Sequence, residues 1–468
     1  MIGRFGDKRD MRRRRALALL LVTMAFFSRP VIAVDRIGLT ASIIGKSTLE
    51  SAKGVFKLGF FTPPGGKGTY LGIWYANIQS NLTVVWVANR QHPVINAPGV
   101  VTLSANGLVI VDAQNTTVWS SPVPAGAITA GATARLHDDG NFAVSSDGSD
   151  SQSVVLWQSF DYPTDTLLPG MKLGEDRKKG ITRNITSWSS PTDPSPGKYT
   201  FKLVLGGLPE FFLFDNSKTT PIYASGPWNG EILTGVPGLK SQQAKGDFTF
   251  TVLSSPEETY YNYSISNRNP SFLTRFFVDG TEGKLQRIWS SDDGKSWINN
   301  KISYPIDPCD NYGSCGAFGY CVYTEGQPQQ CNCLPGFQSL SAQGSFQDTS
   351  KGCARITNLT CGDGDGFWRV NRMKLPDATK ATVHAGMTLD QCRQECLRNC
   401  SCNAYAAADV SGGVNRGCVI WTVGLMDMRK YPEEFVQDLY IRLPQSQIDA
   451  LNAPGEYLIP SFSLFHCI

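Results

Sequence analysis

Cysteine has the greatest potential for chemistry in this chain, because its distribution is strongly uneven. None of the 13 cysteines in the 468 residues lies in the first 308 positions, twelve lie between Cys309 and Cys418, and the last is Cys467. Thiols at such density form disulfides in an oxidising compartment or bind zinc as thiolates. A cysteine-free front and a cysteine-dense back predict at least two kinds of domain.

No residue pattern typical of catalysis is present. The four histidines, His92, His137, His384 and His466, fit no nucleophile, metal or acid–base motif. The sequence also lacks the G-x4-GK[ST] phosphate-binding motif and the glycine-rich, HRD and DFG motifs of protein kinases. We therefore predict that this chain is not an enzyme and that it needs no cofactor.

Residues 1–33 have the features of a secretory signal peptide. A cationic flank at Arg12 to Arg15 precedes an apolar run from Ala16 to Phe27, and Val31-Ile32-Ala33 suits a signal peptidase. The apolar run is shorter than the roughly 20 residues that span a bilayer. Removing residues 1–33 takes away eight basic and two acidic side chains, so the formal net charge changes from +3 to −3. We expect a secreted protein, and the lack of a basic stripe argues against a nucleic-acid partner.

Secretion decides how the cysteines and the N-x-S/T tripeptides are interpreted. In an oxidising compartment, the four cysteines between Cys392 and Cys402 are disulfide candidates, and the nearest histidine, His384, does not make them a zinc site; we expect no metal. Five tripeptides are predicted glycosylation sites. They start at Asn81, Asn115, Asn184, Asn262 and Asn358, whereas a sixth, at Asn399, has Cys400 in its second position.

Residues 34–155 contain a loose internal repeat of strand-forming segments. Its three copies begin at Gly54, Gly107 and Gly140, and each continues through alternating apolar residues to a tryptophan: Trp74, Trp119 and Trp157. Alternation with a period of two predicts half-buried strands. Three similar units predict a threefold all-β domain in which the tryptophans meet in a shared core.

This repeat resembles the bulb-type mannose-binding lectin domain. The lectin motif Q-x-D-x-N-x-V-x-Y aligns in the third copy with His137, Asp139, Asn141, Ala143 and Ser145, so only Asp139 and Asn141 match. In the second copy the Asp is absent. The weak sugar site is therefore placed at His137, Asp139 and Asn141, and a structural Asp-Gly-Asn turn is the favoured alternative.

Residues 156–305 are also rich in strand patterns, and they carry long distinctive strings. These are WQSFDYPTDTLLPGMKLG from Trp157, SWSSPTDPSPGKYTF from Ser187, SGPWNG from Ser225 and, earlier, VVWVANR from Val84. Together they resemble the S-locus glycoprotein and S-domain receptor-like kinase family of plants, from about residue 35 to residue 443. Read from the residues alone, Phe272 to Val278 and Lys284 to Trp289 predict a hairpin around a glycine-containing loop.

Residues 306–355 hold six cysteines, which allow 15 pairings. Their spacing, C-x5-C-x5-C-x9-C-x-C-x19-C, resembles an EGF-like module, and that resemblance implies the pairs Cys309–Cys321, Cys315–Cys331 and Cys333–Cys353. Such a short segment cannot bury enough core, so disulfides must supply stability. Residues 304–308 lack the ligands of a calcium-binding EGF module, so we expect no calcium.

Residues 356–443 resemble a PAN/apple domain. Thr388 and Gln391 form a predicted capping box, with Leu389, Cys392 and Cys396 on one face of the helix that follows. The resemblance implies the pairs Cys392–Cys418 and Cys396–Cys402, which leaves Cys361 for Cys400. Residues 444–468 are expected to be a divergent C-terminal tail, in which Cys467 is a free thiol or part of an intermolecular bridge.

The family resemblance implies the fold and function that we expect. The fold class is mainly β, with two bulb-lectin-like β-prism domains, a small disulfide-rich EGF-like module and a PAN/apple α+β domain. The function is recognition of an extracellular peptide or protein ligand, with recognition of pollen as the best-known role. The PAN domain implies a possible homodimer or pairing with a related receptor. The alternatives are a mannose-type lectin that binds a glycan, and a truncated receptor kinase whose membrane and kinase parts are absent here.

Overall fold

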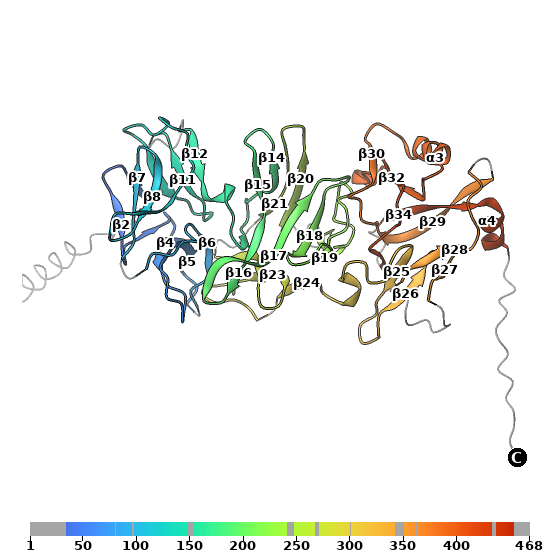
Figure 1. The fold of residues 1–468 in the computed structure, drawn as a ribbon, viewed down its shortest axis with the longest axis horizontal. Coiled ribbons are helices and arrows are strands. Elements are labelled where there is room, and N and C mark those ends of the chain that lie inside the picture. Colours follow the sequence, from blue (N-terminus) through green and yellow to red (C-terminus); the bar gives the residue numbers. More distant parts are fainter. Residues whose placement is uncertain are drawn as a thin grey trace, which may run out of the picture.

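β-Strands dominate the computed structural model of the protein, as the mainly β class requires. The structure describes residues 34–79, 81–95, 98–147, 153–240, 248–266, 271–299, 301–341, 351–361, 364–432 and 437–453. Figure 1 shows three bodies that follow one another along the longest axis, in the order of the sequence. The predicted signal peptide and Cys467 lie outside the described residues.

The first body, called here the first β unit, consists of three four-stranded antiparallel sheets. Their strand orders are β1-β10-β11-β12, β2-β7-β8-β9 and β3-β4-β5-β6. The strands are β1 (Arg36–Gly38), β2 (Ser42–Ile44), β3 (Thr48–Glu50), β4 (Phe56–Phe61), β5 (Tyr70–Tyr75), β6 (Val84–Val87), β7 (Val100–Ser104), β8 (Gly107–Val111), β9 (Thr117–Ser120), β10 (Thr133–Leu136), β11 (Phe142–Ser145) and β12 (Val155–Gln158). Burial alternates along β7 and β10, because successive side chains of a strand point to opposite faces.

Three tryptophans meet in the first β unit, but one of them is not the residue that the repeat predicted. Trp86, Trp119 and Trp157 lie edge to face, with ring centroids 5.9–6.2 Å apart. Each lies on the last strand of its sheet. Trp74 lies instead on the middle strand β5, half-buried beside Phe61. The prediction for Trp74 is wrong because the repeat matches β4 with β8 and β11. In the sheets, β5 is the strand that corresponds to β8 and β11, so the equivalent tryptophan is Trp86 on the next strand, β6.

The second β unit repeats the arrangement of three four-stranded sheets. Their orders are β13-β22-β23-β24, β15-β14-β21-β20 and β16-β17-β18-β19. The strands are β13 (Thr166–Leu167), β14 (Leu173–Asp176), β15 (Ile181–Arg183), β16 (Ile185–Ser190), β17 (Asp193–Val204), β18 (Glu210–Asp215), β19 (Pro221–Ala224), β20 (Phe248–Ser254), β21 (Glu258–Ile265), β22 (Thr274–Asp279), β23 (Lys284–Trp289) and β24 (Ile302–Tyr304). The predicted hairpin is confirmed as β22 and β23. One continuous hydrophobic core, from Ile37 to Tyr304, runs through both units.

The third body combines the EGF-like and PAN-like segments in one eight-stranded sheet of order β26-β25-β33-β29-β34-β31-β32-β30. Its strands are β25 (Gly319–Val322), β26 (Gln330–Cys333), β29 (Asp365–Lys374), β30 (Thr382–His384), β31 (Ala404–Ala406), β32 (Cys418–Trp421), β33 (Met428–Lys430) and β34 (Gln437–Pro444). A separate pair is formed by β27 (Phe337–Ser339) and β28 (Cys353–Arg355). The link between the segments is the parallel pairing of Tyr320 with Met428 and of Cys321 with Arg429.

The capping box at the start of α3 (Leu389–Arg398) is confirmed. The Gln391 backbone N–H donates to Thr388 Oγ1 at 3.2 Å, and the Thr388 N–H donates to Gln391 Oε1 at 2.8 Å. At the other end of α3, the guanidinium of Arg442 on β34 donates to the carbonyl oxygens of Cys396, Leu397 and Asn399. A cation at this position satisfies carbonyls that have no partner within the helix and complements the helix dipole.

Asp365 completes the surroundings of Arg442. Its Oδ2 lies 3.0 Å from Arg442 Nη2, and both side chains are fully buried. Because a buried charge without a partner is very costly, this ion pair ties β29 to β34 and to the end of α3. Further along, α4 (Gln445–Asn452) occupies the first part of the segment expected to be a tail. Its Ile448 is buried against Gly366, where an added Cβ would lie only 2.7 Å from Ile448 Cδ1.

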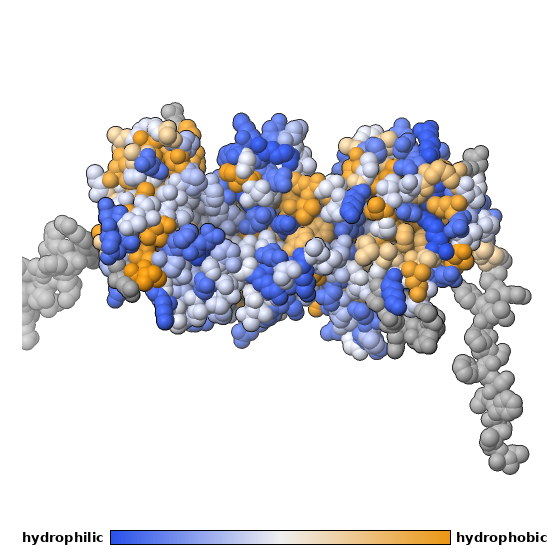
Figure 2. Space-filling view, viewed as in Figure 1, coloured by the Kyte–Doolittle hydropathy of each residue, from blue (hydrophilic) through white to orange (hydrophobic). Residues whose placement is uncertain are grey.

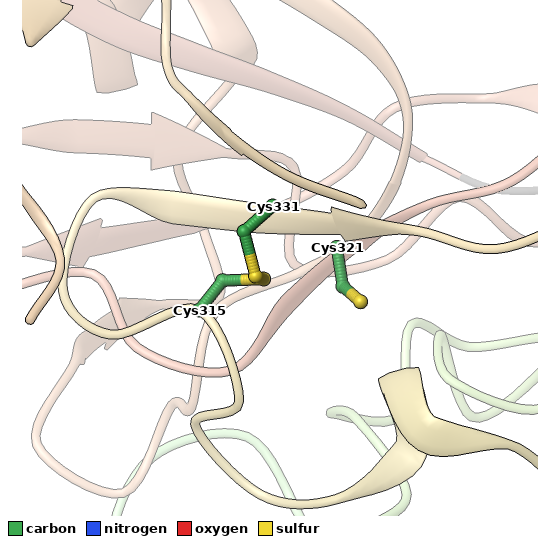
Figure 3. A group of neighbouring side chains, drawn as sticks. All are labelled: Cys315, Cys321 and Cys331. Carbon is green, nitrogen blue, oxygen red and sulfur yellow. A yellow bond between two sulfur atoms is a disulfide. The ribbon is translucent and has the colours of Figure 1, made fainter. Parts of the chain in front are cut away.

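The part of the chain that the structure describes contains six disulfides, and their pairs are those that the two module resemblances imply. They are Cys309–Cys321, Cys315–Cys331, Cys333–Cys353, Cys361–Cys400, Cys392–Cys418 and Cys396–Cys402. The sulfurs of Cys315, Cys321 and Cys331 lie within 4.8 Å of one another (Figure 3). This cluster is not a zinc site of free thiolates, because each of the three sulfurs is bonded in a disulfide.

Candidate functional site

Two of the three predicted sugar residues, Asp139 and Asn141, lie at the edge of a cavity between the two β units. The cavity has a volume of about 660 Å³. Figure 2 shows a hollow between the first two bodies, beside the hydrophilic tip of the β14–β15 hairpin. This interdomain cleft is lined by Asp139, Asn141, Gln158, Phe160, Asp161, Gly170, Lys172, Asp176, Lys178, Lys179, Arg183, Ser255, Glu257 and Glu258.

The turn between β10 and β11 supplies the wall formed by the first β unit. The Gly140 N–H donates to the His137 carbonyl at 3.1 Å, and the His137 N–H donates to the Asn141 carbonyl at 2.8 Å. Gly140 has φ of +90°, a conformation that favours glycine. Asp139 Oδ1 accepts the Asn141 N–H at 2.9 Å, as in an Asx turn. Of the three predicted sugar residues, Asp139 and Asn141 line the cleft and His137 does not.

The side-chain amide of Asn141 is occupied by contacts within the protein. Its Nδ2 donates to Gln158 Oε1 at 2.9 Å. Its Oδ1 accepts both the hydroxyl of Ser159, at 3.2 Å, and the backbone N–H of Phe160, at 3.3 Å. An amide that grips a sugar must present its oxygen and nitrogen to hydroxyl groups of the ligand. The contacts of Asn141 therefore favour its role in the turn and in holding the segment after β12.

The wall formed by the second β unit is built around a buried arginine. Arg183 on β15 is only 2% exposed. Its Nε and Nη2 donate to Asp161 Oδ1 at 2.9 and 2.6 Å, and Nη2 lies 3.6 Å from Asp176 Oδ2. Among the described residues, its Nη1 has no hydrogen-bond partner. A buried guanidinium donor without a partner is costly, and it indicates that an acceptor from water or a ligand belongs here.

Opposing effects act on the pKa of Asp176, which lines the cleft beside Arg183. Burial raises the pKa of its carboxyl, but the hydrogen bond from the Lys179 backbone N–H and the positive charges of Arg183 and Lys179 outweigh burial. The net pKa is lower than usual. Asp176 therefore remains ionised at neutral and mildly acidic pH, and the buried charges of this wall persist.

The rim of the cleft carries charges of both signs. Lys172 Nζ lies 3.0 Å from Glu258 Oε2 and 3.9 Å from the centre of the Tyr260 ring. Lys178 and Glu257, at the tips of neighbouring hairpins, are exposed, and no ion pair involves either of them in the described part of the chain. The cleft holds no histidine, cysteine or paired nucleophile and base. Its chemistry suits binding of a ligand that carries both charges, not covalent catalysis.

The predicted glycosylation sites differ in accessibility. Asn81, Asn115 and Asn358 are exposed, whereas Asn184 and Asn262 are half-buried on strands or between them. Asn115 adopts φ of +61° at the tip of the β8–β9 hairpin. Asn81 lies in the connection between β5 and β6, and it lines a second cavity.

No described helix combines the length and apolar character needed to cross a membrane.

Three family models match the chain. The D-mannose binding lectin family matches residues 83–189, the S-locus glycoprotein domain matches residues 223–341, and the PAN-like domain matches residues 361–428. None of the three matched domains is catalytic. The lectin match crosses the junction between the two β units, so it includes both walls of the interdomain cleft in part.

Known proteins of similar sequence cover nearly the whole chain. The S-locus-specific glycoprotein S6 of Brassica oleracea is 40% identical over 430 residues, which is 91% of this chain and 95% of that protein. The receptor-like serine/threonine-protein kinase SD1-8 of Arabidopsis thaliana is 41% identical over 426 residues, which is 90% of this chain and 48% of that protein. The chain thus spans about half the length of the receptor kinases that it matches.

Solved structures give a more limited likeness. A monomeric mannose-binding lectin from Gastrodia elata matches 27% of this chain and 96% of its own, with 17% identity and a TM-score of 0.20. A lectin from Marasmius oreades matches 27% of this chain and 90% of its own, with 15% identity and a TM-score of 0.21.

Proposed function

The chain belongs to the family of S-locus glycoproteins and S-domain receptor-like kinases, and on this premise we propose that it recognises an extracellular peptide or protein. The interdomain cleft is the proposed binding site. The receptor kinases that the chain matches are about twice as long as the chain, so the proposal concerns recognition and not kinase activity.

One observation favours a peptide over a neutral sugar as the ligand of the interdomain cleft. The groups in the cleft that keep a free atom for a ligand are charged: the ammonium of Lys178, the carboxylate of Glu257, one oxygen of which accepts the Ser255 hydroxyl at 3.0 Å, and the buried guanidinium of Arg183. The amide that would grip a sugar, that of Asn141, is held by Gln158, Ser159 and Phe160. Fixed charges of both signs complement charged side chains and termini of a peptide, and they gain little from a neutral hexose.

A mannose-type lectin is the second candidate function. It is favoured by the match of residues 83–189 to the D-mannose binding lectin family and by the position of Asp139 in the cleft. A carboxylate can accept hydrogen bonds from two adjacent sugar hydroxyls. This candidate requires a sugar to bind through Asp139 without the amide of Asn141.

Binding measurements on the secreted chain distinguish the two candidates. A phage-displayed library of random peptides and an array of mannose oligosaccharides are the probes. We expect enrichment of charged peptides and no retention of mannose. For the best synthetic peptide, Lys178→Glu or Glu257→Lys should weaken binding by roughly tenfold, or about 1.4 kcal/mol.

Matched controls keep this test specific. Lys380→Glu and Glu325→Lys make the same charge changes at exposed positions outside the cleft, and they should leave peptide affinity unchanged. Mannose binding that disappears in Asp139→Asn, with no effect of the charge changes, would establish the lectin function instead. Peptide binding that all four charge variants retain would show that the cleft is not the site.

A further inference from the structure

A second cavity lies at the other contact between the two β units, where β6 adjoins β16 (Figure 1). This cavity, called here the aromatic groove, has a volume of about 530 Å³, within the range of about 300–1,000 Å³ typical of small-ligand sites. Asn81 and Leu82 lie on its side from the first β unit. Trp188, Phe277 and Trp297 supply aromatic side chains from the second.

Asn81 has the features of a glycan attachment site at the edge of this groove. It is exposed, and it begins the tripeptide Asn81-Leu82-Thr83. Thr83 is buried, and its Oγ1 accepts the indole N–H of Trp297 at 2.9 Å. A glycan on Asn81 would therefore start at the groove itself, held by the same segment that contacts Trp297.

Buried donors in the groove lack acceptors. Trp188 Nε1 and Arg275 Nε are both buried, and neither has a hydrogen-bond partner in the described part of the chain. Another nitrogen of Arg275 is used: Nη1 donates to the Val84 carbonyl at 3.2 Å and to Thr166 Oγ1 at 3.0 Å, and the guanidinium lies 4.3 Å from the centre of the Phe277 ring. Two buried donors without acceptors at one site favour a ligand that is rich in hydrogen-bond acceptors.

N-acetylglucosamine, the sugar attached to asparagine in N-glycans, has this chemistry. Its acetamide carbonyl and ring hydroxyls are acceptors, and its pyranose ring has an apolar face that packs on aromatic rings. Half-exposed aromatic side chains combined with a few polar groups are typical of sites for such ligands.

We propose that the N-glycan attached to Asn81 packs its core N-acetylglucosamines into the aromatic groove and joins the two β units. The proposal is independent of the peptide-binding function, because the aromatic groove and the interdomain cleft share no lining residue. The sugar contacts Trp188, Arg275 and Phe277 of the second unit while its covalent bond lies on the first. The other exposed candidates, Asn115 and Asn358, line neither cavity, so their glycans extend into solvent.

Protection from endoglycosidase H tests the proposal on the intact secreted chain. The protein is made in cells restricted to oligomannose glycans. The enzyme cuts between the two core N-acetylglucosamines and leaves one on each asparagine, so mass spectrometry of peptides measures cleavage at each site. Under native conditions we expect the glycan at Asn81 to be released at least about tenfold more slowly than that at Asn115, a difference of about 1.4 kcal/mol. After denaturation both should be released at the same rate.

Variants in the groove connect the protection to the proposed contacts. Trp188→Ala should make the Asn81 glycan as sensitive as the Asn115 glycan. Because Trp188 also stacks on Phe61, Phe277→Ser provides a second variant at a half-buried position of the groove. Unmodified Asn81, equal native release at Asn81 and Asn115, or protection that persists in a folded Phe277→Ser variant would each overturn the proposal.

Discussion

The two β units and the disulfide-rich third body are stabilised in different ways. The β units contain no cysteine and share one continuous core, in which Trp86, Trp119 and Trp157 contact one another. The third body has smaller clusters of buried apolar residues, six disulfides and fully buried ion pairs such as Lys374–Asp427 and Arg442–Asp365. The comparison teaches that a shared, aromatic-rich core does for the β units what covalent links do for the third body, whose apolar clusters are smaller.

Reduction of the disulfides should separate the two kinds of region with the largest effect. Each native disulfide typically contributes about 2–5 kcal/mol, so loss of all six should unfold the third body. The β units lose no covalent link, and they should remain folded. Limited proteolysis with and without a phosphine reductant, followed by mass spectrometry, should yield a resistant fragment that ends near Tyr304. Equal digestion of both regions under reducing conditions would contradict the comparison.

Truncation of one tryptophan should show how the β units depend on their aromatic core. Trp86→Ala should cost roughly 3–5 kcal/mol, because it empties the centre of the tryptophan cluster and removes the hydrogen bond from Nε1 to the Tyr162 carbonyl. Trp74→Ala is the matched control, since Trp74 is half-buried on β5 and should cost clearly less. Urea unfolding followed by far-UV circular dichroism measures both. A larger loss for Trp74→Ala than for Trp86→Ala would contradict the central role of the tryptophan cluster in the stability of the β units.

The smallest predicted effect is a pH dependence at the junction of the second β unit and the third body. Burial raises the pKa of Asp427 to about 6, although Lys374 Nζ lies 2.6 Å away, and burial together with the negative charge of Asp377 also raises the pKa of Glu210. The folded chain therefore keeps protons that the unfolded chain releases from about pH 4 upward. These two carboxyls should make stability fall by roughly 1–3 kcal/mol as the pH rises from about 4 to about 6, whereas carboxyls with a lowered pKa, such as Asp176, contribute with the opposite sign mainly at lower pH.

Thermal unfolding between pH 4 and pH 8 measures this slope. Glu210→Gln imitates the protonated carboxyl, whose Oε2 accepts the Ala378 N–H, so the variant should have a smaller slope. Glu325→Gln changes an exposed residue, and it should behave like the parent protein. A steady gain in stability from pH 4 to pH 6 would show that the ion pair with Lys374 dominates over burial at Asp427.

Local features of the chain could be predicted from the sequence. The capping box at Thr388 and Gln391 and the β22–β23 hairpin depend on residues a few positions apart, and both are found. The wrong prediction of Trp74 in place of Trp86 as the third tryptophan of the cluster has a different cause. Three unequal copies can be aligned strand by strand only when the sheet partners are known, because Ile73-Trp74 and Val85-Trp86 are both apolar-Trp pairs and the sequence does not distinguish them.

Non-local features of the candidate sites could not be predicted in the same way. Asp139 and Asn141 were identified, but the charged residues that face them, such as Lys178, Arg183 and Glu257, come from hairpins of the other β unit. The aromatic groove joins Asn81 to Trp188 and Phe277, more than 100 residues away in the chain. No local pattern specifies which surfaces of two units meet, so these sites emerge only from tertiary packing.

The parallel pairing of β25 with β33 has a consequence for how such proteins diversify. Small cysteine-rich modules can be exchanged by recombination when each brings a closed boundary. Here a recombination point between Arg355 and Cys361 would replace β25 while keeping β33, and β33 would become an edge strand unless the incoming module supplied a matching strand. The EGF-like and PAN-like segments are therefore expected to be inherited together, as one unit of exchange.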